Sequence, residues 1–208
     1  MKTSNKLLIG MFLFILILIP FSIYLSFKKV QNLRSNIKYE TLVIDKQIDS
    51  LIINLAQKSN VQISVGDSFL IKYNNDSKFK YSIIGKSLYL DNDFSIKLKV
   101  PDSISYVSVF AGKCEFYHLN QDSLFLKTLN LYPCRIIDSK IQNLHLELRA
   151  TKFKLKNTSI SSLDFDFKDY SVLSANNLSN IDDIQGIVDS TSSITIAGTR
   201  KINMNNNN

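Results

Sequence analysis

The sequence predicts an all-β domain, a parallel β-solenoid of stacked coils of about 20 residues, placed after one N-terminal transmembrane helix. Three observations predict this fold. An uncharged apolar run lies near the N-terminus, short segments after it alternate between apolar and polar residues, and these segments recur every 19 to 22 residues. A repeat of this length is typical of coils that cannot bury an apolar face alone and therefore stack on one another.

The apolar run covers residues 7–27 and contains no charged side chain. A bilayer core about 30 Å thick requires about 20 helical residues, so this run is long enough to span it. It is also longer than the apolar part of a cleaved signal peptide, and no A-x-A cleavage pattern follows it. We therefore expect residues 7–27 to be an uncleaved helix in contact with the lipid bilayer, preceded by a basic segment at residues 1–6.

Basic residues flank the predicted span on both sides, with Lys2 and Lys6 before it and Lys28 and Lys29 after it. Lysines at these positions can meet anionic headgroups. A count of all flanking basic residues favours a cytoplasmic C-terminal domain by the positive-inside rule. A large domain after a single N-terminal anchor favours an exported one. We expect an extracytoplasmic domain, in the periplasm or at the cell surface, and the orientation stays open.

The formal net charge of +7 is distributed unevenly along the chain. Residues 1–40 hold six basic residues and one acidic residue, whereas residues 41–208 hold 19 basic and 17 acidic residues. The surplus thus lies beside the predicted membrane segment. This distribution predicts no basic stripe for phosphates and no nucleic-acid partner.

Short alternating segments dominate the sequence after a polar juxtamembrane linker expected at residues 28–40. They include VQISV, IKLKV, LHLEL and LDFDF, at residues 61–65, 96–100, 144–148 and 163–167. A period of two with β-branched and aromatic residues indicates strands with one buried face. Residues 41–200 are therefore predicted to form the all-β domain. The Asn-rich residues 201–208 are predicted to be a disordered tail.

The recurrence is seen in two series of apolar positions. The first is the centre of a leading strand, at Val107, Leu126, Leu146, Phe165 and Ile187. The second opens a trailing strand, at Cys114, Cys134, Phe153, Val172 and Ile194. Parallel stacking would place equivalent residues ~4.8 Å apart. An antiparallel β-sandwich or jelly roll also has evenly spaced strands and stays open as the alternative.

The same register places outward side chains of neighbouring coils opposite each other. Opposite charges adjoin in two such pairs and like charges in two others: Lys127–Glu147 and Glu115–Arg135, then Glu147–Asp166 and Arg135–Lys154. Charge therefore permits the register without selecting it.

Cys114 and Cys134 are separated by 20 residues, so both are expected to point inward in adjacent coils. A separation of ~4.8 Å falls within the ~4.4–6.8 Å between Cα atoms that a disulfide allows. An oxidising compartment would permit that bond. Two buried thiols acting as small apolar side chains are equally compatible with the spacing.

No constellation typical of catalysis or metal binding occurs in the sequence. The two histidines, His118 and His145, do not lie in a metal-ligand spacing, and no GxSxG, P-loop or GxGxxG is present. His145 is expected to lie between Phe125 and Asp164 of neighbouring coils, on an exposed ladder. We expect no enzymatic activity, no cofactor and no bound metal.

Two stretches end in small residues at a predicted turn, VSVFAG before Cys114 and SITIAG at residues 193–198. With the repeat, they resemble the auto-transporter adhesin "head GIN" domain family, which looks like stacked coils joined by small-residue turns. This chain differs from that family in having only 6 glycines. Larger residues at its other turns predict wider corners.

The resemblance implies a surface or periplasmic solenoid of unknown biochemical role, and it carries over no functional residues. The apolar run, the repeat and the absence of catalytic groups predict a membrane-anchored, non-enzymatic module with an adhesin-like or envelope-structural role. A protein or a glycan would be its partner on the β face. An envelope lipid-handling bridge, with one anchor and an apolar groove in the β-domain, is the alternative function.

Overall fold

The computed structural model describes residues 14–29, 39–56, 59–74, 79–129, 131–196 and 201–206. The chain divides into two compact units, Met1–Lys38 and Tyr39–Asn208. The β-domain therefore begins two residues before the predicted boundary at residue 41.

The first unit contains a helix over residues 14–29. This helix includes Lys28 and Lys29, which were expected to open the linker. Lys2 and Lys6, the start of the predicted span and most of the predicted linker lie outside the described residues. In the part of the chain that is described, no helix combines the length and the apolar character needed to cross a membrane.

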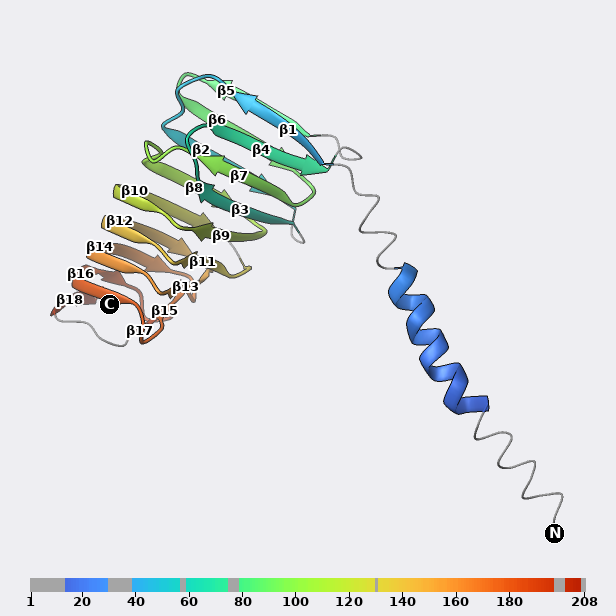
Figure 1. Cartoon of the computed structure of the whole chain (residues 1–208). Coiled ribbons are helices and arrows are strands. Elements are labelled where there is room, and N and C mark those ends of the chain that lie inside the picture. The colour runs from blue at the N-terminus through green and yellow to red at the C-terminus, as the bar shows by residue number, and fades with distance from the viewer. Residues whose placement is uncertain are drawn as a thin grey trace, which may run out of the picture. The chain divides into compact units, whose positions relative to one another are not determined.

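The second unit consists of two nine-stranded sheets. Sheet A has, in spatial order, β1 (Tyr39–Ile44), β4 (Phe69–Asn74), β7 (Ile96–Val100), β3 (Asn60–Val65), β9 (Lys113–Tyr117), β11 (Cys134–Ile137), β13 (Lys152–Lys156), β15 (Val172–Ala175) and β17 (Ser193–Ile196). Sheet B has β18 (Lys201–Asn206), β16 (Asn180–Val188), β14 (Ser159–Lys168), β12 (Lys140–Arg149), β10 (Asn120–Leu129), β8 (Tyr106–Phe110), β2 (Ser50–Leu55), β6 (Ser87–Asn92) and β5 (Lys80–Ile84). Consecutive coils from β8 onward contribute one strand to each sheet and lie side by side (Figure 1).

Parallel stacking of these coils is confirmed. Val107, Leu126, Leu146 and Phe165 are successive register partners in sheet B, and none is more than 2% exposed. The equivalent column of sheet A begins with Cys114, Cys134 and Phe153. Since these pairs are parallel, the antiparallel sandwich is wrong for this part of the chain.

The predicted columns are wrong by one residue at two positions. Gly186, not Ile187, lies opposite Phe165. A Cβ atom at Gly186 would lie 2.2 Å from the carbonyl oxygen of Phe165 and 2.7 Å from its ring, so only glycine leaves room for that ring. In sheet A, Leu173 rather than Val172 faces the core, and its partner is Ile194.

The strands before β8 depart from the predicted succession of coils. The coil formed by β2 and β3 lies between the coil of β6 and β7 and the coil of β8 and β9. In addition, β1 and β7 pair antiparallel with β4, and β5 pairs antiparallel with β6. These strands cover the end of the solenoid, as the terminal units of repeat proteins do.

The Asn-rich segment also differs from its prediction. Residues 201–206 form β18, which pairs in parallel with β16 and places Ile202 opposite Ile184. The edge of β16 offers backbone hydrogen-bonding groups that a further strand can pair with. Composition alone had indicated disorder.

The corners of the coils explain how a chain with few glycines can turn sharply. His118, Asp138 and Asn157 occupy equivalent corners of successive coils and have φ values of 55°, 50° and 52°. Asp, Asn and His tolerate this left-handed conformation better than other residues. The side chain of Asn157 also donates a 2.8 Å hydrogen bond to Asp138 Oδ1. These corners are therefore tight, and the greater width expected at the turns with larger residues stays a prediction.

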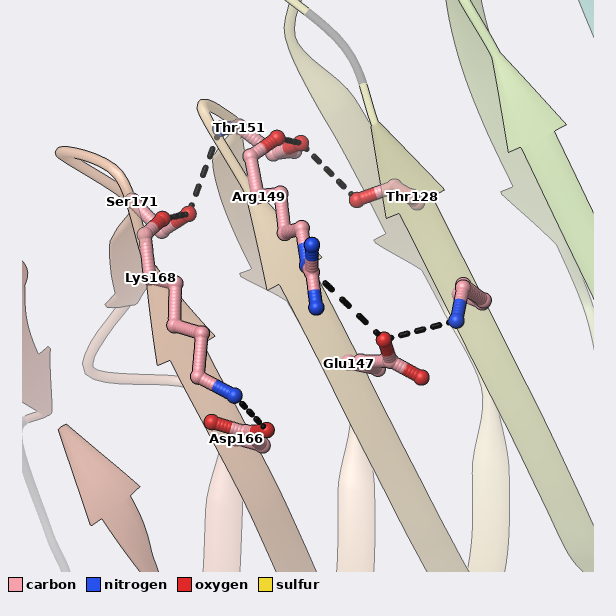
Figure 2. A network of polar contacts seen from close by, with 8 residues as sticks. Thr128, Glu147, Arg149, Thr151, Asp166, Lys168 and Ser171 are labelled. Carbon is pink, nitrogen blue, oxygen red and sulfur yellow. Dashed lines mark hydrogen bonds and ion pairs between the residues drawn. The ribbon is translucent and has the colours of Figure 1, made fainter.

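Buried hydroxyl groups connect the coils at the opposite corner (Figure 2). Thr128 Oγ1 donates to Thr151 Oγ1 at 2.9 Å, and the backbone N–H of Thr151 donates to Ser171 Oγ at 3.3 Å. All three side chains are at most 1% exposed. The row satisfies polar groups that would otherwise be desolvated without a partner.

Candidate ligand-binding face

One row of side chains crosses the outer face of sheet B from coil to coil. Tyr106, Phe125, His145 and Asp164 are successive register partners on β8, β10, β12 and β14. Alternation along each strand turns their neighbours, such as Leu126, into the core. The row therefore depends directly on the buried column beside it.

The rings of this row stack on one another. The ring centroids of Tyr106 and Phe125 are 5.3 Å apart, and those of Phe125 and His145 are 4.3 Å apart. His145 Nδ1 donates a 2.7 Å hydrogen bond to Asp164 Oδ2. Because a carboxylate only accepts, this bond places a proton on Nδ1 and leaves Nε2 as an acceptor in the neutral ring. The predicted position of His145 between Phe125 and Asp164 is confirmed.

A hollow of about 230 Å³ lies along the row. A second set of side chains lines it: Ser123, Asn143 and Ser162, which are also register partners. The hollow thus combines hydroxyl, amide, imidazole and carboxylate groups with the face or edge of a phenyl ring. A few convergent polar groups next to aromatic surface are what binding a polar, ring-containing ligand requires.

This second set was missed by the sequence analysis. A usable signal exists, because each member lies three residues before the column residue of its coil, Leu126, Leu146 or Phe165. The chain bends just before these residues, at Asp122 and Gln142, which have no register partner in this strand pair. From Ser123 to Leu126 the alternation is regular, so counting back from the column residue places Ser123 on the outer face.

Charged side chains form a separate row on the same face (Figure 2). Lys127 Nζ lies 2.7 Å from Glu147 Oε1, which confirms that predicted pair, and Arg149 Nε lies 4.0 Å from the same oxygen. Asp166 pairs instead with Lys168 at 2.7 Å, which compensates for its like-charged neighbour Glu147. Partly exposed pairs of this kind contribute about 0.2–1 kcal/mol each. Their charges are satisfied within the row, so we assign them to the framework of the sheet.

On sheet A, the charged and polar contacts gather around Glu115, whose side chain is only 6% exposed. It accepts hydrogen bonds from Lys113 Nζ at 2.8 Å and Tyr117 Oη at 2.9 Å, and Arg135 lies 3.5 Å away, as predicted. Burial alone would raise the pKa of Glu115. The hydrogen bonds from Lys113, Tyr117 and Gln62 outweigh burial and hold this pKa below its usual value.

Cys114 and Cys134 lie opposite each other in register and are fully buried thiols in the structure. Burial, with the neighbouring Cys134, raises the pKa of the Cys114 thiol well above its usual value. A thiol held in its neutral form is a poor nucleophile. The two side chains thus act as small apolar residues here, and a disulfide between them stays a prediction.

Neither histidine contributes to a metal centre in the described structure. His118 is an exposed corner residue, and His145 has one carboxylate partner. Over the described ranges, no three His, Cys, Asp or Glu side chains come together in a way that could hold a metal ion.

No protein-family model matches the sequence, and no curated protein matches it. Solved structures do match. A "putative adhesin" from Bacteroides fragilis is 13% identical over 81% of this chain and 97% of its own length, with a TM-score of 0.51. A "putative lipid binding protein" from Parabacteroides distasonis is 12% identical over 82% and 98% of the two chains, with a TM-score of 0.43.

At this identity, the likeness to the Bacteroides fragilis chain shows the fold. The protein described here is thus an all-β protein with a parallel β-solenoid, and it shares that fold with the Bacteroides fragilis chain.

Proposed function

We propose that this protein is a non-enzymatic contact module, tethered to a membrane, that binds a glycan on the outer face of sheet B. The observation that carries the proposal is the row from Tyr106 to Asp164 with its polar hollow. A hydroxyl-rich sugar presents both the hydrogen-bonding groups and the apolar ring face that such a surface complements. The adhesin-like fold supports the same reading.

The tether is the uncharged run at residues 7–27 with its flanking lysines. In the described helix the large apolar side chains are exposed, from 45% at Ile15 to 69% at Ile17. A continuous apolar surface of this kind requires cover, and a bilayer supplies it. We further propose that the β-domain is exported. Protease added to intact cells, permeabilised cells and spheroplasts tests this placement: protection of the domain in spheroplasts would contradict it.

The interior favours the contact module over a lipid-handling bridge. Phe116, Phe153, Phe165 and Phe167 are among the largest fully or almost fully buried side chains between the sheets. An acyl chain would need the volume that these rings occupy.

Glycan arrays probed with the full chain in nanodiscs test the proposal. The double variant Asn143→Ala/His145→Ala removes two polar side chains of the hollow and leaves the buried column intact. At about 1 kcal/mol for each lost hydrogen bond, we expect glycan affinity to fall about 30-fold. Thr195→Ala, an exposed change on sheet A, serves as the control. Undiminished glycan binding by the double variant, or binding of no glycan by the parent chain, would contradict the proposal.

A further inference from the structure

The outer face of sheet A concentrates positive charge that the overall charge count conceals. Six exposed lysines on β4, β7 and β13 point away from the core and define the basic face: Lys72, Lys97, Lys99, Lys152, Lys154 and Lys156. Among the described residues, none of these six forms an ion pair. Their charge is therefore available to a partner.

Among the described outward positions of sheet A from β4 to β13, a single acid occurs, and it does not neutralise the basic face. That acid is Glu115, which is buried and already bound by Lys113 and Arg135. The balancing carboxylates of the domain lie elsewhere, among them Glu147, Asp164 and Asp166 on sheet B. A near-neutral domain thus has one strongly basic side.

Two open hollows on this side each collect three cations. Lys72 and Lys97 are cross-strand partners, and with Lys99 they line a hollow of about 320 Å³. Arg135 and Lys154 are partners on adjacent coils, and with Lys156 they line a hollow of about 410 Å³. Like charges directly opposite each other destabilise a sheet. An anion held between them would remove that cost.

Apolar side chains lie among the cations, together with the polar Gln62 and Ser64 of β3. Leu70 lies opposite Lys99, and Tyr117 and Ile137 continue the row towards Lys156. All three are partly exposed. Lysines interleaved with aliphatic and tyrosine side chains suit the headgroup region of a bilayer, where phosphate lies next to hydrocarbon. Binding of single-stranded nucleic acid would instead require a series of exposed rings along the groove.

We propose that the basic face docks on a bilayer surface rich in anionic phospholipid, with each group of three cations around lipid phosphates. The inference rests on the membrane tether proposed above and not on the ligand of sheet B. Docking in this way would lay sheet A against the lipid and leave the row from Tyr106 to Asp164, on the other sheet, open to a partner.

Vesicle capture tests this docking. The full chain is held in nanodiscs of pure phosphatidylcholine, so that its N-terminal segment is already in lipid, and is mixed with vesicles containing phosphatidylglycerol or with vesicles of phosphatidylcholine alone. We expect capture of the phosphatidylglycerol vesicles only. Because each lysine near an anionic surface contributes about 1 kcal/mol, the variants Lys97→Gln/Lys99→Gln and Lys154→Gln/Lys156→Gln should each weaken capture about 30-fold.

The matched control is Arg149→Gln/Lys168→Gln, which removes two positive charges from the outer face of sheet B and should leave capture unchanged. Equal capture of both kinds of vesicle, or equal loss in the control, would overturn the inference. Capture of single-stranded RNA without capture of phosphatidylglycerol vesicles would also overturn it and assign the basic face to nucleic acid. Glycan binding by the same nanodiscs is read separately. Glycan binding that persists without vesicle capture would reject the membrane docking and leave the proposed glycan binding intact.

Discussion

The coils from β8 to β17 and the strands from β1 to β7 share one continuous core but are assembled differently. In the coils, chain order equals spatial order and each side chain column continues from one coil to the next. In the first part, chain order is rearranged and three of the pairings are antiparallel. The difference shows that a regular repeat is suited to the middle of a solenoid, where each coil is covered by the next. At the end of the solenoid a different arrangement of strands is needed to cover the last apolar layer.

The largest expected effect contrasts one glycine from each part. Gly186→Ala would place a Cβ atom 2.2 Å from a backbone oxygen of the neighbouring coil, whereas at Gly85, in the β5–β6 turn, nothing lies within 4 Å. We expect a loss of about 4 kcal/mol in the free energy of unfolding for Gly186→Ala, from overpacking and backbone strain together. Gly85→Ala should cost only about 1 kcal/mol, the strain of its positive φ. Urea denaturation measures both, and similar losses would show that the coil packing is not the cause.

Truncation of a buried leucine or isoleucine is expected to have the next largest effect. Leu146→Ala in β12 and Ile71→Ala in β4 both remove fully buried side chains and should each cost about 3 kcal/mol. The two variants should differ in which strands of the domain open first. Native-state hydrogen exchange should lose protection first in β10, β12 and β14 for Leu146→Ala, and in β1, β4 and β7 for Ile71→Ala. Uniform loss over the whole domain in both variants would mean that the two parts unfold as one unit.

The buried hydroxyl row of Thr128, Thr151 and Ser171 belongs to the coils, and breaking it should cost less. Thr151→Val keeps the shape of the side chain but leaves Thr128 Oγ1 without its partner and removes the bond to the carbonyl of Arg149. We expect a loss of about 2 kcal/mol, measured by thermal or urea unfolding. Exposed Thr195→Val provides the control. Equal stability of the two variants would show that the row contributes nothing.

The smallest effect concerns the junction of the two parts, where Gln62 of β3 donates to Glu115 of β9. The pKa of Glu115 is lower in the folded protein than its ordinary value of 4.5. Its contribution to stability is therefore fully present above pH 4.5 and is lost as the pH falls through the folded pKa. The urea midpoint of the parent chain should fall more steeply below that pH than the midpoint of Glu115→Gln. Parallel pH profiles would contradict the assignment.

The regular coils and the row with Phe125 and His145 could be predicted from the sequence, since once the column through Leu126 and Leu146 is set, period two places every neighbour. The prediction failed at Gly186 because the spacing of apolar residues does not show that the ring of Phe165 occupies the space that a side chain of the next coil would need. It failed for β1, β4 and β5 because alternation is the same for parallel and antiparallel strands. The basic face was missed because a net charge carries no information about which side of a sheet holds each residue.

The antiparallel strands have a consequence for growth of the structure by addition of further copies. At the β1 and β5 end, β1 runs in the same direction as the coils of sheet A, but β5 runs against those of sheet B. A second molecule adding its last coil there would find a matching direction on one side and a reversed one on the other. Slanted, evenly spaced parallel hydrogen bonds do not fit a reversed strand. The mismatch disfavours end-to-end polymerisation of the β-domain, so we expect no fibres.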